Sequence, residues 1–412
     1  MSQFQLAHPP ADGITTVRFA KTQNLLLVSS WDSGVRLYDV ASNTLKSRYY
    51  HKAGVLDCCF GDDTMAFSGS VDKTVKMYEF TSGQESILGS HDKAVRSVEF
   101  NEARGIVVSG SWDRSLKIWD YRAKGAVSKH DLPEKVFTMT ISGDRVVVGT
   151  AGRHILIYDL RQMSEPEQSR ESSLKYQTRA IKAFPDGTGY ALSSIEGRVA
   201  IEFFDPSPAS QARKYAFKCH RVNQDGVDHV YPVNALAFHP QYGTFATGGC
   251  DAVVNIWDPV NKKRLCQFQR FPTSISSCAF SNDGSLLAIA SSYTFEQGDM
   301  DHPPDTIYIR PVLEADVRPR TGTAPAPPPP AAAPPAFGGF GGAPAPGGFG
   351  GAPPPPPGFG GFGGPAPGGF PGAPPGGFGG PGGWMPPMGG FHPPPPPPGG
   401  FMPPGGFGGP RP

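Results

Sequence analysis

The sequence predicts an all-β fold for the first 320 residues, a seven-bladed β-propeller, followed by a disordered tail rich in Pro, Gly and Phe. Three observations support this prediction. A strand–turn–strand pattern recurs in the first part of the chain, its turns are regularly spaced, and the composition changes abruptly near Arg320. We therefore expect two domains, residues 1–320 and residues 321–412.

The repeat is clearest in three stretches: SGSVDKTVKMYEF from Ser68, SGSWDRSLKIWDY from Ser109 and TGGCDAVVNIWDP from Thr247. Each runs from small residues through an Asp turn into an alternating strand that ends in an aromatic residue. The spacing of the first four turns, 39 to 41 residues, is the period of a four-stranded propeller blade. Turns are expected at Asp32, Asp72, Asp113, Gly152, Glu196 and Asp251, with a degenerate seventh at Thr294.

Before each turn lies a strand of alternating apolar and polar residues: TTVRFA, GVLDCCF, AVRSVEF, KVFTMTI, RAIKAF, VNALAF and SISSCAF. These units predict seven WD-repeat blades, and closing them into a ring removes long exposed sheet edges. We expect Phe4–Leu6 to add the outer strand of the last blade and Ile307–Arg310 to supply one of that blade's own strands.

Four residues of the third unit match a hydrogen-bonded tetrad of WD repeats: His91, Ser109, Asp113 and Trp119. The same residue types would suit a catalytic Ser-His-Asp set, but His51, Ser68, Asp72 and Tyr78 repeat the spacing one blade earlier, and catalysis needs only one copy. The repetition therefore favours a structural role. No phosphate-cradling loop, zinc-protease motif or nucleophile elbow is found, so the sequence predicts no enzyme and no cofactor.

Charge and cysteine content narrow the function classes further. The 36 acidic and 37 basic residues nearly cancel, which disfavours non-specific nucleic-acid binding. The six cysteines form no Cys-x-x-Cys pair and several lie in apolar runs, so we expect reduced, buried thiols and no metal site. No apolar run is long enough for a membrane span and the N-terminus has no signal-peptide core, so we expect a soluble cytosolic or nuclear protein.

The tail, residues 321–412, differs from the rest of the chain in composition and in charge. It holds 32 Pro and 31 Gly in 92 residues, and Arg411 is its only charged residue. Because Pro and Gly disfavour both helices and sheet ladders, it cannot bury a core. Polyproline II stretches are expected at Pro353–Pro357 and Pro393–Pro398, where profilin-like, SH3 or WW partners are candidate ligands.

The residues that precede the turns point to a binding face, because the turns lie on one rim of a propeller. These positions hold Trp31, Trp112 and Tyr293, and large aromatic side chains on one rim favour a binding surface. The alternative is that each ring only covers the neighbouring blade. The other four positions hold Val71, Ala151, Ile195 and Cys250.

Three arginines of the fifth blade and its exit, Arg179, Arg198 and Arg221, are candidates for binding carboxylate or phosphate at the same rim. The simpler interpretation is that they are solvated surface residues.

Several longer strings closely resemble one family. ESSLKYQTRAIKAFPDGTGYALSSIEGRVAIEFFDPSP, YAFKCHR, SWDSGVRLYDV and the run NIWDPVNKKRLCQFQRFPTSISSCAFSNDGSLLAIASSYTFE are similar to spindle-checkpoint WD-repeat proteins of the budding-uninhibited-by-benzimidazole (Bub) family. The similarity covers about residues 4–320. It does not extend to the tail, which that family usually lacks.

This resemblance implies a nuclear adaptor that acts at the kinetochore in mitosis. Its top face would hold a helical motif of a checkpoint kinase and of a pseudokinase relative, and the complex would dock on phosphorylated Met-Glu-Leu-Thr repeats of a kinetochore scaffold. By motif match, Arg198 and Arg221 would bind the phosphothreonine, with Trp31 and Arg18 alongside. Arg179 would pair with acidic residues of the helix, and we add Trp112 to that face.

A sister family, the WD-repeat mRNA-export factors that bind a nucleoporin peptide, is the alternative. It shares the strings SIEGRVA and KCHR, and the Gly-Gly-Phe-Gly tail resembles nucleoporin repeats. SWDSGVRLYDV, NKKRLCQFQRFPTSI and the fourth blade favour the checkpoint family. A splicing or ubiquitin-ligase scaffold on the same propeller is a third possibility. No direct contact with nucleic acid or membrane is expected.

Overall fold

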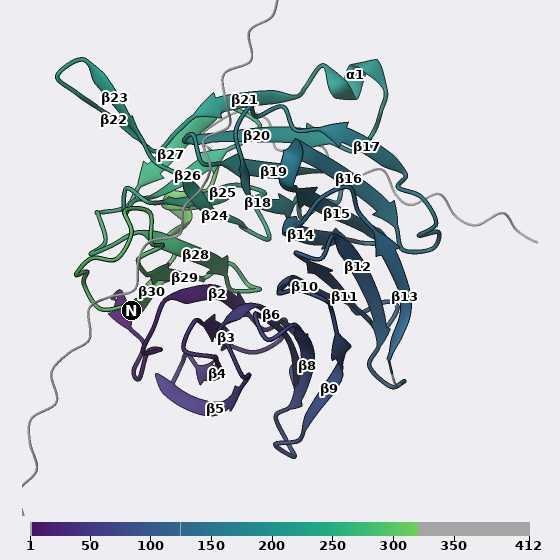
Figure 1. The fold of residues 1–412 in the computed structure, drawn as a ribbon. Coiled ribbons are helices and arrows are strands. Elements are labelled where there is room, and N and C mark those ends of the chain that lie inside the picture. Colours follow the sequence, from purple (N-terminus) through teal and green to yellow (C-terminus); the bar gives the residue numbers. More distant parts are fainter. Residues whose placement is uncertain (1, 124, 320–412) are drawn as a thin grey trace, which may run out of the picture. The chain divides into compact units, whose positions relative to one another are not determined.

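The computed structural model describes residues 2–123 and 125–319, and these form a ring of seven four-stranded antiparallel sheets (Figure 1). The predicted seven-bladed propeller is therefore confirmed. The tail at residues 321–412 and its two polyproline stretches lie outside the described residues.

The blades follow one another along the chain, and strand order within each blade is the order of the sequence. The first blade consists of β2 (Ile14–Phe19), β3 (Leu25–Ser30), β4 (Gly34–Asp39) and β5 (Thr44–Tyr50). The second consists of β6 (Val55–Asp62), β7 (Met65–Ser70), β8 (Thr74–Glu79) and β9 (Glu85–Ser90). The third consists of β10 (Val95–Asn101), β11 (Ile106–Ser111), β12 (Ser115–Asp120) and β13 (Ala126–Asp131). Each inner strand contacts the inner strands of both neighbouring blades, which closes the ring around an axial channel.

The remaining blades repeat this plan. The fourth blade consists of β14 (Val136–Ser142), β15 (Arg145–Thr150), β16 (His154–Asp159) and β17 (Gln168–Glu171), and the fifth of β18 (Thr178–Ala183), β19 (Gly189–Ser194), β20 (Arg198–Phe203) and β21 (Tyr215–Lys218). The sixth consists of β24 (Val233–Phe238), β25 (Phe245–Gly249), β26 (Val254–Asp258) and β27 (Lys263–Gln267). The seventh consists of β28 (Ile275–Phe280), β29 (Leu286–Ser291) and β30 (Thr306–Pro311), to which the N-terminal β1 (Phe4–Gln5) is added as the outer strand.

The two ends of the ring meet in the seventh blade. β1 pairs antiparallel with β30, Phe4 opposite Ile309, and the amide of Leu6 donates to the carbonyl of Ile307 at 2.9 Å. The predicted closure by the N-terminal segment is thus present in the structure. Because the first strand of the chain completes the last blade, this pairing joins the two ends of the ring.

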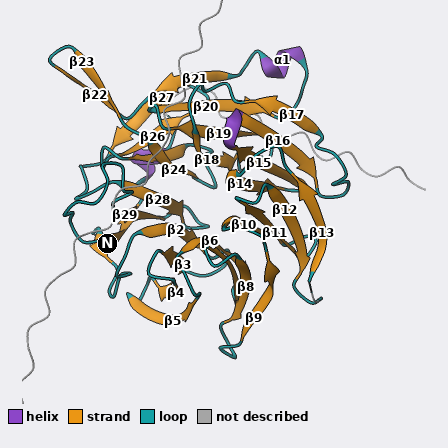
Figure 2. Cartoon of the chain, in the orientation of Figure 1, coloured by secondary structure: helices purple, strands orange, loops and turns teal. Residues whose placement is uncertain are grey.

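Helical structure is sparse, as the repeat predicts (Figure 2). It consists of the 3₁₀ turn η1 (Ala151–Arg153), α1 (Pro208–Gln211) and α2 (Glu314–Val317). None of the described helices has the length and apolar character that crossing a membrane requires. A two-stranded hairpin, β22 (Arg221–Gln224) and β23 (Val227–Val230), projects from the ring between the fifth and sixth blades (Figure 1).

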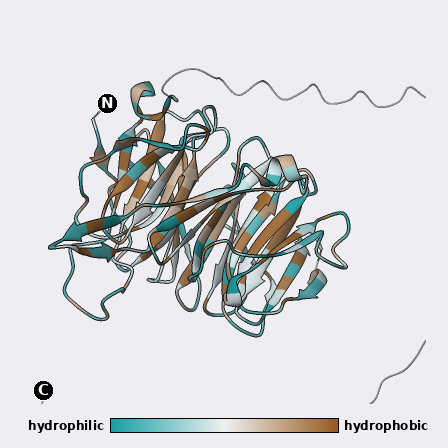
Figure 3. Cartoon of the chain, turned by 90° about the horizontal axis from the view of Figure 1, so that it is seen from above, coloured by the Kyte–Doolittle hydropathy of each residue, from teal (hydrophilic) through white to brown (hydrophobic). Residues whose placement is uncertain are grey.

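The core lies between neighbouring blades, because each sheet buries one face against the preceding sheet of the ring and the other face against the following sheet. Side chains of the third and fourth blades, for example Val108 and Met139, form one such buried cluster. Apolar residues are concentrated on the strands and hydrophilic residues at the turns (Figure 3).

This packing explains the glycine of the repeated Ser-Gly-Ser and Thr-Gly-Gly strings. A Cβ on Gly69 would lie 2.5 Å from Val95 Cγ1, and a Cβ on Gly248 would lie 2.4 Å from Ile275 Cγ2. In both cases the valine or isoleucine belongs to the inner strand of the following blade, so a side chain here would force the two blades apart.

The predicted tetrad residues of the third blade form a continuous hydrogen-bond network. Trp119 Nε1 donates to Ser109 Oγ at 2.8 Å, and Ser109 Oγ lies 2.7 Å from His91 Nε2. Since the Asp113 carboxylate can only accept, the proton of the neutral imidazole lies on Nδ1, 3.0 Å from Asp113 Oδ2, and Nε2 accepts from the serine hydroxyl. Every polar atom in this buried chain thereby has a partner.

In the sixth blade the same network links His220, Thr247, Asp251 and Trp257. In the second blade one expectation is wrong. His51 contacts Asp72 and Ser68 as expected, but the hydroxyl that reaches Ser68, at 3.0 Å, belongs to Tyr49. Tyr78 instead contacts Ser47, because its ring stacks on Tyr49 with 4.5 Å between centroids.

The seventh turn also differs from the expectation. Thr294 does not lie in a tight turn, since residues 292–305 form a long loop between β29 and β30. Asp305 accepts a hydrogen bond from the amide of Tyr293, and Tyr293 Oη donates to the carbonyl of Gly298. The loop is thus held by its own side chains and extends over the rim.

Candidate functional site

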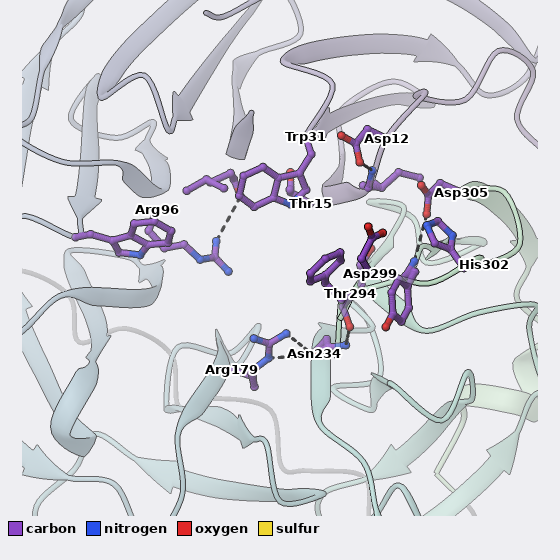
Figure 4. Close-up of a pocket in the computed structure, with 17 residues that line it drawn as sticks. Asp12, Thr15, Trp31, Arg96, Arg179, Asn234, Thr294, Asp299, His302 and Asp305 are labelled. Carbon is purple, nitrogen blue, oxygen red and sulfur yellow. Dashed lines mark hydrogen bonds between the residues drawn. The ribbon is translucent and has the colours of Figure 1, made fainter. Parts of the chain in front are cut away.

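The main cavity, of about 620 Å³, opens where the loop of residues 292–305 meets the axial channel (Figure 4). Turns and inner strands of the first, second, third, fifth, sixth and seventh blades contribute to it. Its lining includes Asp12, Thr15, Trp31, Arg96, Trp112, Arg179, Asn234, Tyr293, Phe295, Asp299, His302 and Asp305. We call it the mouth cavity. Four residues singled out in the sequence as candidates for the binding face are brought together here: Trp31, Trp112, Arg179 and Tyr293.

Trp31 lies at the edge of the mouth cavity with 48% of its side chain exposed. Part of its indole covers the backbone of the link to the second blade, where a Cβ on Gly54 would lie 2.5 Å from the ring. Trp31 therefore covers the neighbouring blade, as the alternative interpretation expects, and also presents apolar surface to solvent; its role in binding stays a prediction.

Arg179 is held in place by a neutral partner. Its Nε and Nη2 donate to Asn234 Oδ1 at 3.0 and 2.7 Å, and Asn234 Nδ2 donates in turn to the carbonyl of Ile275. Within the described chain Arg179 has no ion pair, and its Nη1 donates no hydrogen bond. A fixed guanidinium with an unused donor is suited to bind a carboxylate.

Residues of the mouth cavity that the sequence reasoning missed include Arg96, Asn234, Phe295 and His302. The side chain of Phe295 is 65% exposed, and its backbone is in the left-handed region with φ of 61°. The signal for the loop was the polar, Pro-containing stretch EQGDMDHPPD, which is too long for a turn between two strands of one blade. Nothing in the repeat pattern indicated Asn234.

Below the mouth, the channel narrows to a cavity of about 90 Å³ lined by residues of all seven inner strands. Arg18 lies here, with Nη2 2.9 Å from Glu99 Oε1 and 3.6 Å from Asp57 Oδ1. Burial opposes its charge, but the two carboxylates outweigh burial and raise the pKa of Arg18 above its usual value. The structure does not bring Arg18 to Arg198 and Arg221, because Arg18 is neutralised inside the channel.

Arg198 and Arg221 do meet, away from the mouth cavity, and both contact Glu196. Arg198 Nε lies 3.1 Å from Glu196 Oε1, while Arg221 Nη2 donates to the carbonyl of Glu196 at 3.1 Å. Arg221 Nη1 also lies 3.5 Å from Asp228 Oδ2 on the projecting hairpin. Nε of both arginines is buried without donating a hydrogen bond to any described residue. Neither Nη atom of the partly exposed Arg198 side chain donates a hydrogen bond to a described residue, so these atoms are the spare donors of the pair for an anion.

Trp31 does not join this arginine pair, since neither Arg198 nor Arg221 lines the mouth cavity that Trp31 borders. The described side chains also hold no group of three or more His, Cys, Asp or Glu placed to bind a metal ion.

Comparison with known proteins agrees with this architecture. A family model described as "WD domain, G-beta repeat" matches residues 2–39, 42–79, 83–120 and 218–258. A solved structure titled "Structure of U3-55K" superposes with a TM-score of 0.66, covering 76% of this chain and 98% of that one, at 16% identity. That likeness concerns the fold alone.

Curated relatives are much closer in sequence. "Mitotic checkpoint protein BUB3.1" of Arabidopsis thaliana is 57% identical, and "Mitotic checkpoint protein bub3" of Dictyostelium discoideum is 53% identical. The matches cover 78% and 77% of this chain and 96% of each relative. The "Poly(A)+ RNA export protein" of Schizosaccharomyces pombe is 38% identical over 77% of this chain and 92% of its own length. The chain belongs to the Bub3 family of mitotic checkpoint proteins.

Proposed function

We propose that this protein is a non-enzymatic adaptor of the mitotic spindle-assembly checkpoint, acting in the nucleus and at the kinetochore. The high identity to mitotic checkpoint proteins over nearly their whole length supports the checkpoint role. The hydrogen-bonded tetrads support an adaptor without catalysis, since they engage the Ser, His and Asp side chains of the repeat in the fold itself.

The mouth cavity is the proposed site for a short helical motif of a checkpoint kinase and its pseudokinase relative. Trp31 and Trp112 supply apolar surface for one face of an amphipathic helix. Arg179 supplies a preoriented cation for an acidic residue of the helix. Such a combination of aromatic side chains and a desolvated arginine is typical of the centres of protein interfaces.

The Arg198–Arg221 pair is the proposed site for phosphothreonine in Met-Glu-Leu-Thr repeats of a kinetochore scaffold. The convergence of the two arginines at Glu196 is the observation that carries this part of the proposal. A phosphothreonine brings about −1.5 to −2 charges and three acceptor oxygens to a pair that is now compensated by Glu196 and, at 3.5 Å, by the half-exposed Asp228. Because Arg18 is paired inside the channel, it has no role in this proposal, and Trp31 is assigned to the helix.

The test is fluorescence polarisation with matched phosphorylated and unmodified Met-Glu-Leu-Thr peptides, in the presence of the kinase-derived helix. We expect clearly tighter binding of the phosphorylated peptide. Equal affinity for the two peptides would remove the kinetochore-reader function and favour the alternative below.

The alternative is an mRNA-export factor that binds a nucleoporin peptide. It is supported by the 38% identity to an RNA export protein and by the Gly-Gly-Phe-Gly tail. Affinity purification from mitotic cells separates the two candidates: the checkpoint kinase in the eluate supports the adaptor, whereas a nucleoporin without the kinase supports export.

A further inference from the structure

A second hollow on the rim, of about 370 Å³, adjoins the mouth cavity across the third, fourth and fifth blades. Its walls are basic and aromatic. The cations are Lys93, Arg96, Lys135 and Arg179, and the rings are those of Trp112 and Phe137. We call it the basic pocket. No carboxylate lines it, whereas Asp12, Asp299 and Asp305 line the mouth cavity.

The four cations of the basic pocket share an unusual property: among the described residues, none of them forms an ion pair. Arg96 donates only to the carbonyl of Leu56, at 3.3 Å, and Arg179 donates only to Asn234. Lys135 Nζ lies over the Phe137 ring at 5.6 Å from its centroid. By contrast, Arg198 and Arg221 have Glu196 and Asp228 as partners.

Unpaired cations close together repel one another when water is partly excluded. Burial lowers the pKa of Arg96; Asp57 opposes this shift, and the neighbouring Arg179 and Arg18 add to it. An anion bound between these cations would remove the repulsion and would use N–H donors that now have no acceptor.

Thr178 provides an independent indication of a ligand. It lines the basic pocket, only 2% of the residue is exposed, and its Oγ1 has no hydrogen-bond partner among the described residues. A buried hydroxyl without a partner is unfavourable in the free protein, so its position favours an acceptor delivered by a bound molecule.

We infer that the basic pocket binds a phosphomonoester carried on an apolar or aromatic group, at a site separate from the Arg198–Arg221 pair. A single carboxylate would leave most of the four cations uncompensated, whereas a phosphomonoester is close to doubly charged at pH 7. Its three oxygens offer acceptors for the unpaired N–H donors that line the pocket, among them those of Arg96 and the two lysines. Trp112 and Phe137 would flank the group that bears the phosphate. The site shares Trp112 and Arg179 with the proposed helix site but does not depend on that function.

The probe is phenyl phosphate, titrated into the full-length protein by isothermal calorimetry. Every protein carries the background change Arg198→Ala, Arg221→Ala, so that phosphate held by the arginine pair is not counted. We expect Lys93→Ala, Lys135→Ala to weaken binding at least tenfold, because two of the four cations are lost. Lys93→Arg, Lys135→Arg should retain binding, since the charges remain.

The matched control is Lys46→Ala, Lys263→Ala, which removes two exposed lysines from the outer strands β5 and β27 and changes net charge equally. It should bind as the background protein does. Phthalate, an aromatic dicarboxylate, should bind at least tenfold more weakly than phenyl phosphate. The inference is overturned if phenyl phosphate does not bind at millimolar concentration, if the two lysine pairs have equal effects, or if phthalate binds equally well. None of these results bears on phosphothreonine binding, which is measured with Arg198 and Arg221 intact.

Discussion

Arg221 donates a 3.1 Å hydrogen bond to the main-chain oxygen of Glu196, the residue whose carboxylate lies 3.1 Å from Nε of Arg198. Glu196 is part of the tight turn before β20, and Arg221 begins the hairpin that follows the fifth blade. A turn and a hairpin separated along the chain thus present two guanidinium groups at one place. Because the main chain and the carboxylate of Glu196 hold one guanidinium group each, less side-chain entropy remains to be lost when an anion binds.

The first prediction concerns this pair. Arg198→Ala, Arg221→Ala should abolish the preference for the phosphorylated Met-Glu-Leu-Thr peptide, since each lost charge-assisted bond is worth about 1.5–3 kcal/mol. Lysine at both positions should restore the preference only in part, because an ammonium lacks the planar fork of arginine. Fluorescence polarisation measures the affinity of each variant for the phosphorylated and the unmodified peptide. Binding of the kinase-derived helix should be unchanged, and a phosphate preference that survives in the alanine protein would show the site to be elsewhere.

The second prediction concerns the helix site. Arg179→Ala should weaken binding of the kinase-derived helix by about 2–5 kcal/mol, because a carboxylate of the helix would be left desolvated and unpaired. Calorimetry with the helical peptide measures this loss. Lys46→Ala, which removes an exposed cation from β5, is the control and should have no effect. Equal affinities of the Arg179→Ala protein and the wild type would mean that the helix lies on another surface.

The third prediction is a pH dependence of stability from the tetrads. Burial lowers the pKa of His51 and of His91 below the ordinary value of 6.5, although Asp72 and Asp113 oppose the shift. At a pH between the lowered pKa of the folded chain and the ordinary value of 6.5, each of these histidines binds a proton in the unfolded chain but not in the folded one. Their contribution to stability is therefore full above pH 6.5 and falls as the pH decreases. Hydrogen bonds from Thr74 and Lys52 hold the pKa of Asp72 at about 2 despite burial, so a further loss follows below about pH 4.

The measurement is the free energy of unfolding in urea between pH 7.5 and pH 5.5. His91→Gln should lower stability at pH 7.5 and reduce the slope against pH, because one titrating histidine is removed. A slope that the substitution leaves unchanged would assign the pH dependence to other groups.

The fourth prediction concerns closure of the ring. Leu6 is 3% exposed and packs with side chains of the first and seventh blades, and its amide holds the N-terminal segment to Ile307. Leu6→Ala should lower the free energy of unfolding by about 2–5 kcal/mol, the usual range for such a cavity in a core. Gln5→Ala, at the exposed neighbouring position, is the control. Chemical denaturation that shows no difference between the two variants would mean that β1 contributes little to closure.

The fifth prediction concerns the tail. Its composition predicts that it adds nothing to the core, so ending the chain after Arg320 should change the melting temperature of the propeller by only about one or two degrees. Differential scanning calorimetry of the two proteins compares them directly. A marked loss of thermal stability in the shorter protein would show that the tail packs against the ring.

The sequence by itself determined the blade number, the positions of six of the seven turns and the two strands that close the ring. This was possible because each blade is built from consecutive strands, so its hydrophobic period and its turn residues are local signals. The close approach of the next blade to Gly69 and Gly248 recurs at Gly110 and Gly149, and the glycine at this position of the repeat is visible in the sequence.

Which side chains from different blades meet depends on the closed ring as a whole. Arg18 and Arg198 are both arginines at strand positions, yet Arg18 is neutralised by Glu99 of the third blade inside the channel, whereas Arg198 faces Glu196 at the rim. Likewise, Tyr49 rather than Tyr78 reaches Ser68, and four cations of three blades share one pocket without a carboxylate. These relationships arise between blades, where the ring fixes the distances, and no periodicity within one blade encodes them.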